Sequence, residues 1–89
     1  MAMPDQVTIV LTPEVHKCLL HHLPAKAAAY KPLANATFLS GNVNVGNTFV
    51  VECDLDEARS LLAAANRDCK MAVQAIRLAI SEQQARRRL

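Results

Sequence analysis

Two short runs of β-branched and aromatic residues are each followed by a stretch in which apolar residues recur at helical spacing. Residues 7–11 read Val-Thr-Ile-Val-Leu, and residues 48–53 read Thr-Phe-Val-Val-Glu-Cys. Runs of this composition favour β-strands, and the second run is apolar enough to be buried on both faces. We therefore predict one strand at each place.

Four stretches carry the residue spacing or the composition of helices: 13–23, 25–36 in part, 55–65 and 70–86. Thr12 followed by Pro13 predicts a helix start. The threonine oxygen can accept from a free backbone N–H of the first turn, and proline at the first helical position has no N–H that needs a partner. Asp54 and Glu57 have the spacing of a capping box. Asn66 indicates a break before the last helix, and the sequence leaves open two helices or one kinked helix.

Two glycine-asparagine dipeptides, Gly41-Asn42 and Gly46-Asn47, predict turns. The residues between them alternate apolar and polar, so we expect a strand at 43–45 that pairs antiparallel with 48–53. Residues 37–39 also read as extended chain. The fold class is α+β, with a small sheet of strands 7–11, 43–45 and 48–53 covered by helices on one face. The direction in which 7–11 pairs is left open.

The length of 89 residues predicts a single domain over residues 1–89. Two β-α units, 7–23 and 49–65, have a similar layout, because a shift of 42 residues places Leu19-Leu20 on Leu61-Leu62. A helical and hairpin connector would join them. An internal repeat is one interpretation of this pattern, and chance similarity is the other.

Hydrophobic residues make up 52% of the chain and aromatic residues only 3%, which predicts a thin core in so small a domain. Association of two or more chains would bury apolar surface that a single chain leaves exposed, so we expect a homo-oligomer, most simply a dimer. The expected contact residues are Val43 and Val45 of the edge strand and Met71, Ala75 and Leu78, which form a second apolar stripe on the last helix.

The net charge of +2 is too small to predict binding to nucleic acid. The basic run Arg86, Arg87 and Arg88, with Lys70 and Arg77, nevertheless supports an alternative in which the last helix contacts phosphates. The same arginines would also complement the dipole at the helix end, and no aromatic residues are interleaved with them.

Cys18 and His22 are four residues apart on one predicted helix, so both can face one metal ion, with Cys53 as a third ligand. The pattern is weak, and the sequence predicts no metal and no cofactor. His16 and His21 join His22 in a group that a small ligand-binding protein or enzyme would use. Three cysteines without close spacing predict no disulfide framework and fit a reducing cytoplasm.

No apolar run reaches the ~20 residues of a membrane span. Two glycines do not make a phosphate-binding loop, and no catalytic constellation stands out. The favoured interpretation is a small cytoplasmic, self-associating protein-interaction or regulatory module rather than an enzyme. The nucleic-acid-associated regulator and the ligand-binding protein or enzyme are the alternatives.

Overall fold

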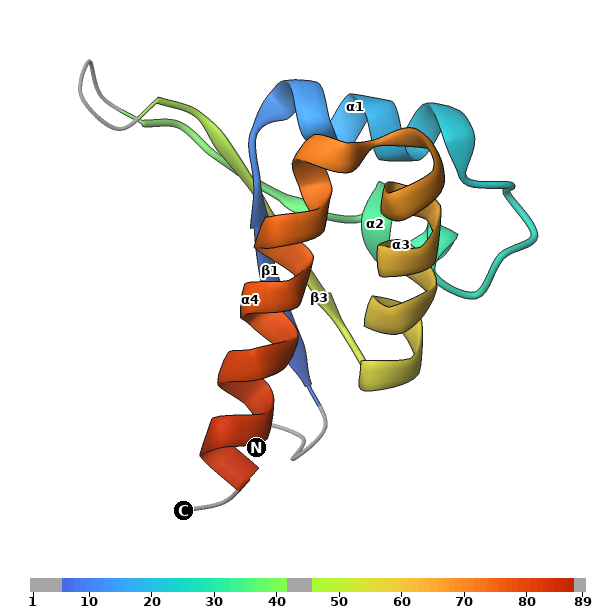
Figure 1. The fold of residues 1–89 in the computed structure, drawn as a ribbon. Coiled ribbons are helices and arrows are strands. Elements are labelled where there is room, and N and C mark those ends of the chain that lie inside the picture. The colour runs from blue at the N-terminus through green and yellow to red at the C-terminus, as the bar shows by residue number, and fades with distance from the viewer. Residues whose placement is uncertain (1–5, 42–45, 88–89) are drawn as a thin grey trace.

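The computed structural model describes residues 6–41 and 46–87, and within these ranges it has three strands and four helices. The elements in chain order are β1 (Val7–Leu11), α1 (Pro13–His22), α2 (Tyr30–Ala34), β2 (Thr37–Leu39), β3 (Thr48–Cys53), α3 (Leu55–Asp68) and α4 (Lys70–Arg87). Figure 1 shows the strands side by side, with helices packed on them. The predicted α+β class is confirmed.

The sheet has the order β1-β3-β2, and both neighbouring pairs are antiparallel. Ile9 lies opposite Val51, which settles the direction that the sequence left open. The strand that pairs with β3 from the other side is β2, where Phe38 lies opposite Phe49. The predicted strand at 43–45 lies outside the described residues.

Gly41 contacts the opposite side of the β2–β3 hairpin next to its turn. The Gly41 N–H donates to Asn47 Oδ1 at 3.0 Å. A side chain at Gly41 would overlap the carbonyl oxygen of Gly46. The two glycines predicted as turn residues therefore touch each other across the hairpin, which requires that the first of them have no Cβ.

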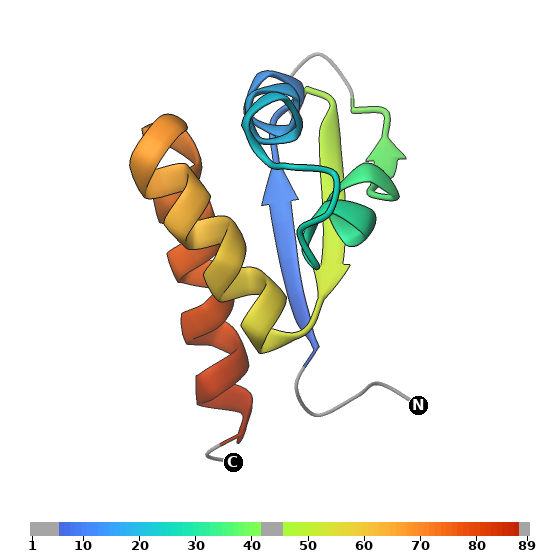
Figure 2. The same cartoon turned by 90° about the vertical axis from the view of Figure 1, so that its right-hand side faces the viewer.

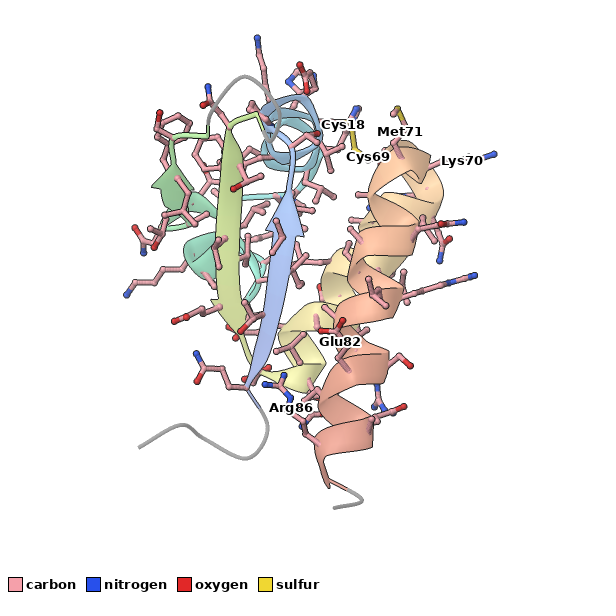
Figure 3. All side chains as sticks on the ribbon, turned by 90° about the vertical axis from the view of Figure 1, so that its left-hand side faces the viewer. Cys18, Cys69, Lys70, Met71, Glu82 and Arg86 are labelled. Atoms are coloured by element: carbon pink, nitrogen blue, oxygen red, sulfur yellow. A yellow bond between two sulfur atoms is a disulfide. The ribbon has the colours of Figure 1, made fainter. Side chains whose placement is uncertain are left out.

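The two faces of the sheet differ in what covers them. Val7, Ile9 and Leu11 of β1 are buried on one face, whereas Thr8 and Val10 are exposed on the other. Figures 1 and 2 show α1, α2 and α3 on the side of the buried face, while α4 runs beside β1. Among the described residues no helix lies over the opposite face, which Figure 3 views directly. The prediction of helices on one face agrees with this arrangement.

Every helix contributes a fully buried side chain to the same core. These side chains are Leu19 of α1, Leu33 of α2, Leu61 of α3 and Ile76 of α4. They meet the buried face of β1 and β3, so one hydrophobic core joins all the described elements except β2, whose residues are all exposed.

The capping signals in the sequence are present as predicted. The Glu57 N–H donates to Asp54 Oδ1 at 2.7 Å, and the Asp54 N–H donates to Glu57 Oε1 at 3.0 Å. At α1, the Val15 N–H donates to Thr12 Oγ1 at 3.3 Å. Local sequence therefore determines where both helices begin.

The predicted break at Asn66 is wrong by three residues. Helix α3 continues through Asn66 to Asp68, and Cys69 alone separates it from α4, so there are two helices. Asn66 is exposed, whereas Ala65 and Cys69 are buried. The apolar stripe thus holds the helix one further turn against the core. The partly helical stretch 25–36 contains only the short α2.

Candidate functional site

A disulfide joins Cys18 in α1 to Cys69 at the junction of α3 and α4, with their Cα atoms 6.2 Å apart. Figure 3 shows both residues at the same end of the molecule. The expectation that the cysteines are unpaired is therefore wrong. The pairing was missed because 51 residues separate the two cysteines, and only the packing of α1 against α3 brings them together.

The position of Cys69 follows from its role as a helix boundary. Its N–H donates to the Ala65 carbonyl at 2.9 Å and ends α3, and its carbonyl accepts from the Ala72 N–H at 2.9 Å and starts α4. The side chain is buried, and Sγ of Cys18 lies 3.7 Å from the carbonyl oxygen of Asp68, the residue before it. One signal in the sequence indicated that Cys69 faces the core: it lies four residues beyond Ala65, at the spacing of the apolar stripe of this helix.

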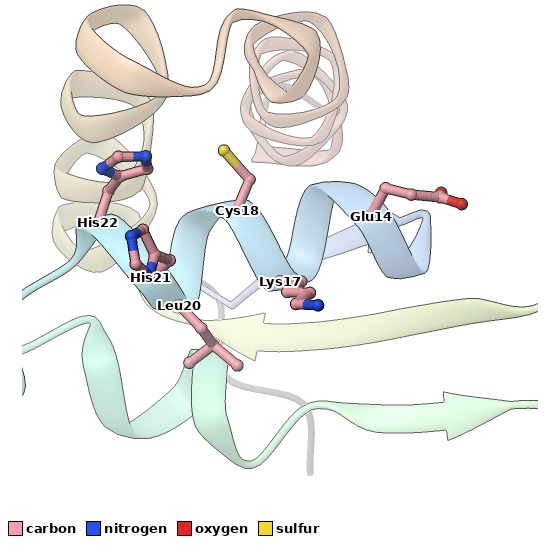
Figure 4. Close-up of a pocket in the computed structure, with 6 residues that line it drawn as sticks. All are labelled: Glu14, Lys17, Cys18, Leu20, His21 and His22. Carbon is pink, nitrogen blue, oxygen red and sulfur yellow. The ribbon is translucent and has the colours of Figure 1, made fainter.

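His22 completes a group of three potential metal ligands. One ligand atom from each of Cys18, His22 and Cys69 lies within 4.8 Å of the others. Figure 4 shows the Cys18 sulfur and the His22 ring pointing to the same side of α1, as expected for residues four apart on a helix. The predicted pair is thus brought together, and its third neighbour is Cys69.

Cys53 lies far from this group. It ends β3 just before α3, whereas Cys69 follows the last residue of α3. A helix of 14 residues spans roughly 21 Å at 1.5 Å per residue. Burial, together with the charges of Glu57 and Asp54, raises the pKa of the Cys53 thiol to about 12. Cys53 is therefore a neutral core residue rather than a partner for Cys18 and His22.

The three histidines do not form one site. His16 is buried, its Nε2 lies 2.8 Å from the Leu33 carbonyl oxygen, and its ring stacks on Phe49 with centroids 4.0 Å apart. This residue ties α1 to α2 and β3. His21 and His22 are exposed at the end of α1, with their rings edge to face at 4.9 Å. The predicted histidine group is thus divided between the core and the surface.

Part of the predicted contact surface is described. Met71 is 86% exposed, Leu78 is 60% exposed, and Ala75 is half-buried. Val43 and Val45 lie outside the described residues. A surface groove between β1 and α4 is lined by Thr8, Val10, Ala75, Leu78, Ala79 and Glu82.

The basic residues of α4 do not share one face. At roughly 100° per residue, Arg77 lies within about 20° of Lys70 around the helix axis, whereas Arg86 is turned by about 160°. Figure 3 shows Lys70 and Arg86 pointing in opposite directions. Arg88 and the side chain of Arg87 lie outside the described part of the chain. The described arginines and lysine therefore do not make a single stripe for phosphates.

No protein family model, curated protein or solved structure matches this chain. Within residues 6–41 and 46–87, no helix has both the length and the apolar character needed to cross a bilayer.

Proposed function

We propose that this chain is a small self-associating interaction module, and that two copies meet through the uncovered sheet face and the adjoining side of α4. The observation that carries the proposal is an apolar surface that continues from the sheet to the helix. This contact surface consists of Val10 and Val50 on the sheet and Ala75 and Leu78 on α4.

The strand register supports the continuity of the contact surface. Val10 lies opposite Val50, so their side chains share the uncovered face, and Val10 is 53% exposed. Val10 also lines the groove in which Ala75 and Leu78 form the other wall. Exposed apolar residues scattered singly are common on proteins, whereas a connected apolar area is typical of an interface.

A second copy of the chain is the occupant that fits this surface. The apolar centre lies between polar residues, Thr8 and Glu52 on the sheet and Glu82 on α4, which is the usual pattern of an apolar core with a polar rim. A two-fold axis places the same patch on both sides. An apolar patch meeting its own copy needs no complementary charge on the partner.

The predicted cytoplasmic location loses the argument that supported it. That argument was the absence of paired cysteines, and Cys18 and Cys69 are paired. Disulfides persist in oxidising compartments and are rare where thiols are kept reduced. Self-association through the contact surface does not depend on the compartment.

Replacing Leu78 with glutamate tests the contact surface. The change puts a charge into an apolar contact twice in a symmetric dimer, so we expect the dimer Kd to rise on the order of 100-fold or more. Native mass spectrometry and light scattering across a concentration series measure the chain count. Ala63→Glu is the matched control, because it adds the same charge at an exposed position of α3 away from the contact surface.

Wild type and Ala63→Glu should be dimers at concentrations at which Leu78→Glu is a monomer with an unchanged circular dichroism spectrum. A wild type that is monomeric throughout the series contradicts self-association. A Leu78→Glu variant that dimerises as wild type does contradicts the proposed surface.

A further inference from the structure

Within residues 6–41 and 46–87, the disulfide and the imidazole beside it form the one group of metal-binding atoms, and the contact surface does not account for it. We propose that, once the Cys18–Cys69 disulfide is reduced, Cys18, His22 and Cys69 bind a thiophilic divalent cation such as Zn²⁺. The disulfide and the metal ion would then be alternative cross-links between α1 and the junction of α3 and α4.

The donor set has the chemistry of zinc. Zn²⁺ is bound in proteins by thiolates at about 2.3 Å and by imidazole nitrogens at about 2.0–2.1 Å. Two thiolates balance the charge of the ion, and a neutral imidazole adds no further charge. Tetrahedral geometry with these bond lengths places ligand atoms on the order of 3.5–3.8 Å apart. The three ligand atoms already lie within 4.8 Å of one another, so small side-chain movements suffice.

The side chains of His22 and Cys18 can make these movements, while Cys69 stays fixed. His22 is exposed, and its ring can turn toward Cys18 without displacing core residues. Cys18 is half-buried, and breaking the disulfide lets its sulfur move away from that of Cys69. Cys69 is held in place by the backbone hydrogen bonds that end α3 and start α4.

The group is open to solvent on two sides. Cys18 lines one surface groove together with His22, shown in Figure 4, and a second groove together with Cys69 and Met71. A cation can therefore enter without unfolding of the chain. Three protein ligands leave the fourth tetrahedral position to water, the arrangement found in open zinc sites.

The conversion balances in two steps. A dithiol reductant transfers two electrons and two protons to the disulfide, which becomes two thiols while the reductant becomes a disulfide. Zn²⁺ then displaces one proton from each thiol and accepts a lone pair from the His22 imidazole, releasing two protons to solvent. The oxidised protein has no thiolate at Cys18 or Cys69, so it should not hold the ion.

The experiment uses the full chain, reduced and kept under argon, with Co²⁺ as a spectroscopic probe and Zn²⁺ as the competing ion. We expect one Co²⁺ per chain, thiolate-to-metal charge-transfer absorption, and d–d bands of tetrahedral intensity that disappear when Zn²⁺ is added. Oxidised protein should show none of these bands. Cys18→Ser and Cys69→Ser should each lose the charge-transfer absorption in large part.

His22→Ala provides the sharpest test, because it changes an exposed residue and should leave the fold intact. We expect it to weaken Zn²⁺ binding at least 10-fold in competition with a chromogenic chelator. His21→Ala is the matched control at the same helix end, and it should bind as wild type does, as should Cys53→Ala. The proposal is overturned if reduced wild type does not bind one ion, if His22→Ala binds normally, or if His21→Ala is equally impaired.

Discussion

Breaking the Cys18–Cys69 disulfide should lower the free energy of unfolding by about 4 kcal/mol. The two cysteines are 51 residues apart, so the bond closes more than half of the chain into a loop. In the chain-entropy model, a loop of this size removes about 14 cal/mol/K of entropy from the unfolded state. That entropy corresponds to about 4 kcal/mol at 25 °C.

The loss is large for so small a protein. Stabilities of roughly 0.05–0.15 kcal/mol per residue predict about 4–13 kcal/mol in total for a chain of this length. The reduced protein therefore keeps between almost none and about two thirds of its stability. With an m-value of about 1 kcal/mol/M in urea for a small domain, the unfolding midpoint should fall by several molar.

The assay is urea unfolding followed by far-ultraviolet circular dichroism, with and without a dithiol reductant, and with a chelator present throughout. The double variant Cys18→Ser, Cys69→Ser is the control, because it should match reduced wild type and be insensitive to the reductant. Cys53→Ala should respond to reductant as wild type does, because its disulfide is intact.

Two results would refute this reasoning. One is a midpoint in reduced wild type that lies within about 0.5 M of the oxidised value, which corresponds to about 0.5 kcal/mol at the same m-value. The other is an equal shift in the double serine variant, which would mean that the reductant acts elsewhere.

Two further predictions concern the core thiol and the hairpin. Folding raises the pKa of Cys53 from 9.0 to about 12, so the stabilising effect of its neutral thiol is complete below pH 9 and is lost as the pH rises toward 12. The difference in free energy of unfolding between wild type and Cys53→Ala should shrink over that range in urea titrations, and a constant difference would contradict the assigned burial. Gly41→Ala forces a methyl group into the Gly46 backbone and should destabilise the protein by about 1–3 kcal/mol. A melting temperature equal to that of wild type would show that the hairpin does not need this close approach.

Local signals in the sequence predicted the helix starts and the strand β3, because caps and apolar spacing act within one or two turns of chain. Asp54 and Glu57 make the expected capping box. The sequence offered two extended segments beside β3, 37–39 and 43–45; the structure pairs 37–39 with β3 as β2, and 43–45 lies outside the described residues. Beside the turn, Gly41 contacts Gly46 and donates a hydrogen bond to Asn47.

The candidate site could be predicted only in part, because sequence patterns report contacts within one or two helical turns and not contacts between distant segments. Cys18 and His22 are neighbours along one helix, so their spacing reveals that they face the same way. Cys69 reaches them through the packing of α1 against α3, and no local pattern records that contact. Nothing in the sequence favoured Cys69 over Cys53 as the third metal ligand. Cys53 was the wrong choice, because the length of α3 separates it from Cys69.

At a free Zn²⁺ concentration about 1,000 times its Kd, the proposed zinc ion would stabilise the reduced protein about as much as the disulfide stabilises the oxidised one. A ligand that binds only the folded state stabilises it by about 4.1 kcal/mol at a free concentration 1,000 times its Kd. That value equals the roughly 4 kcal/mol that reduction of the disulfide removes. Bound zinc would therefore restore the urea midpoint of the reduced protein. The chain would then keep α1 fixed to the α3–α4 junction in both redox states.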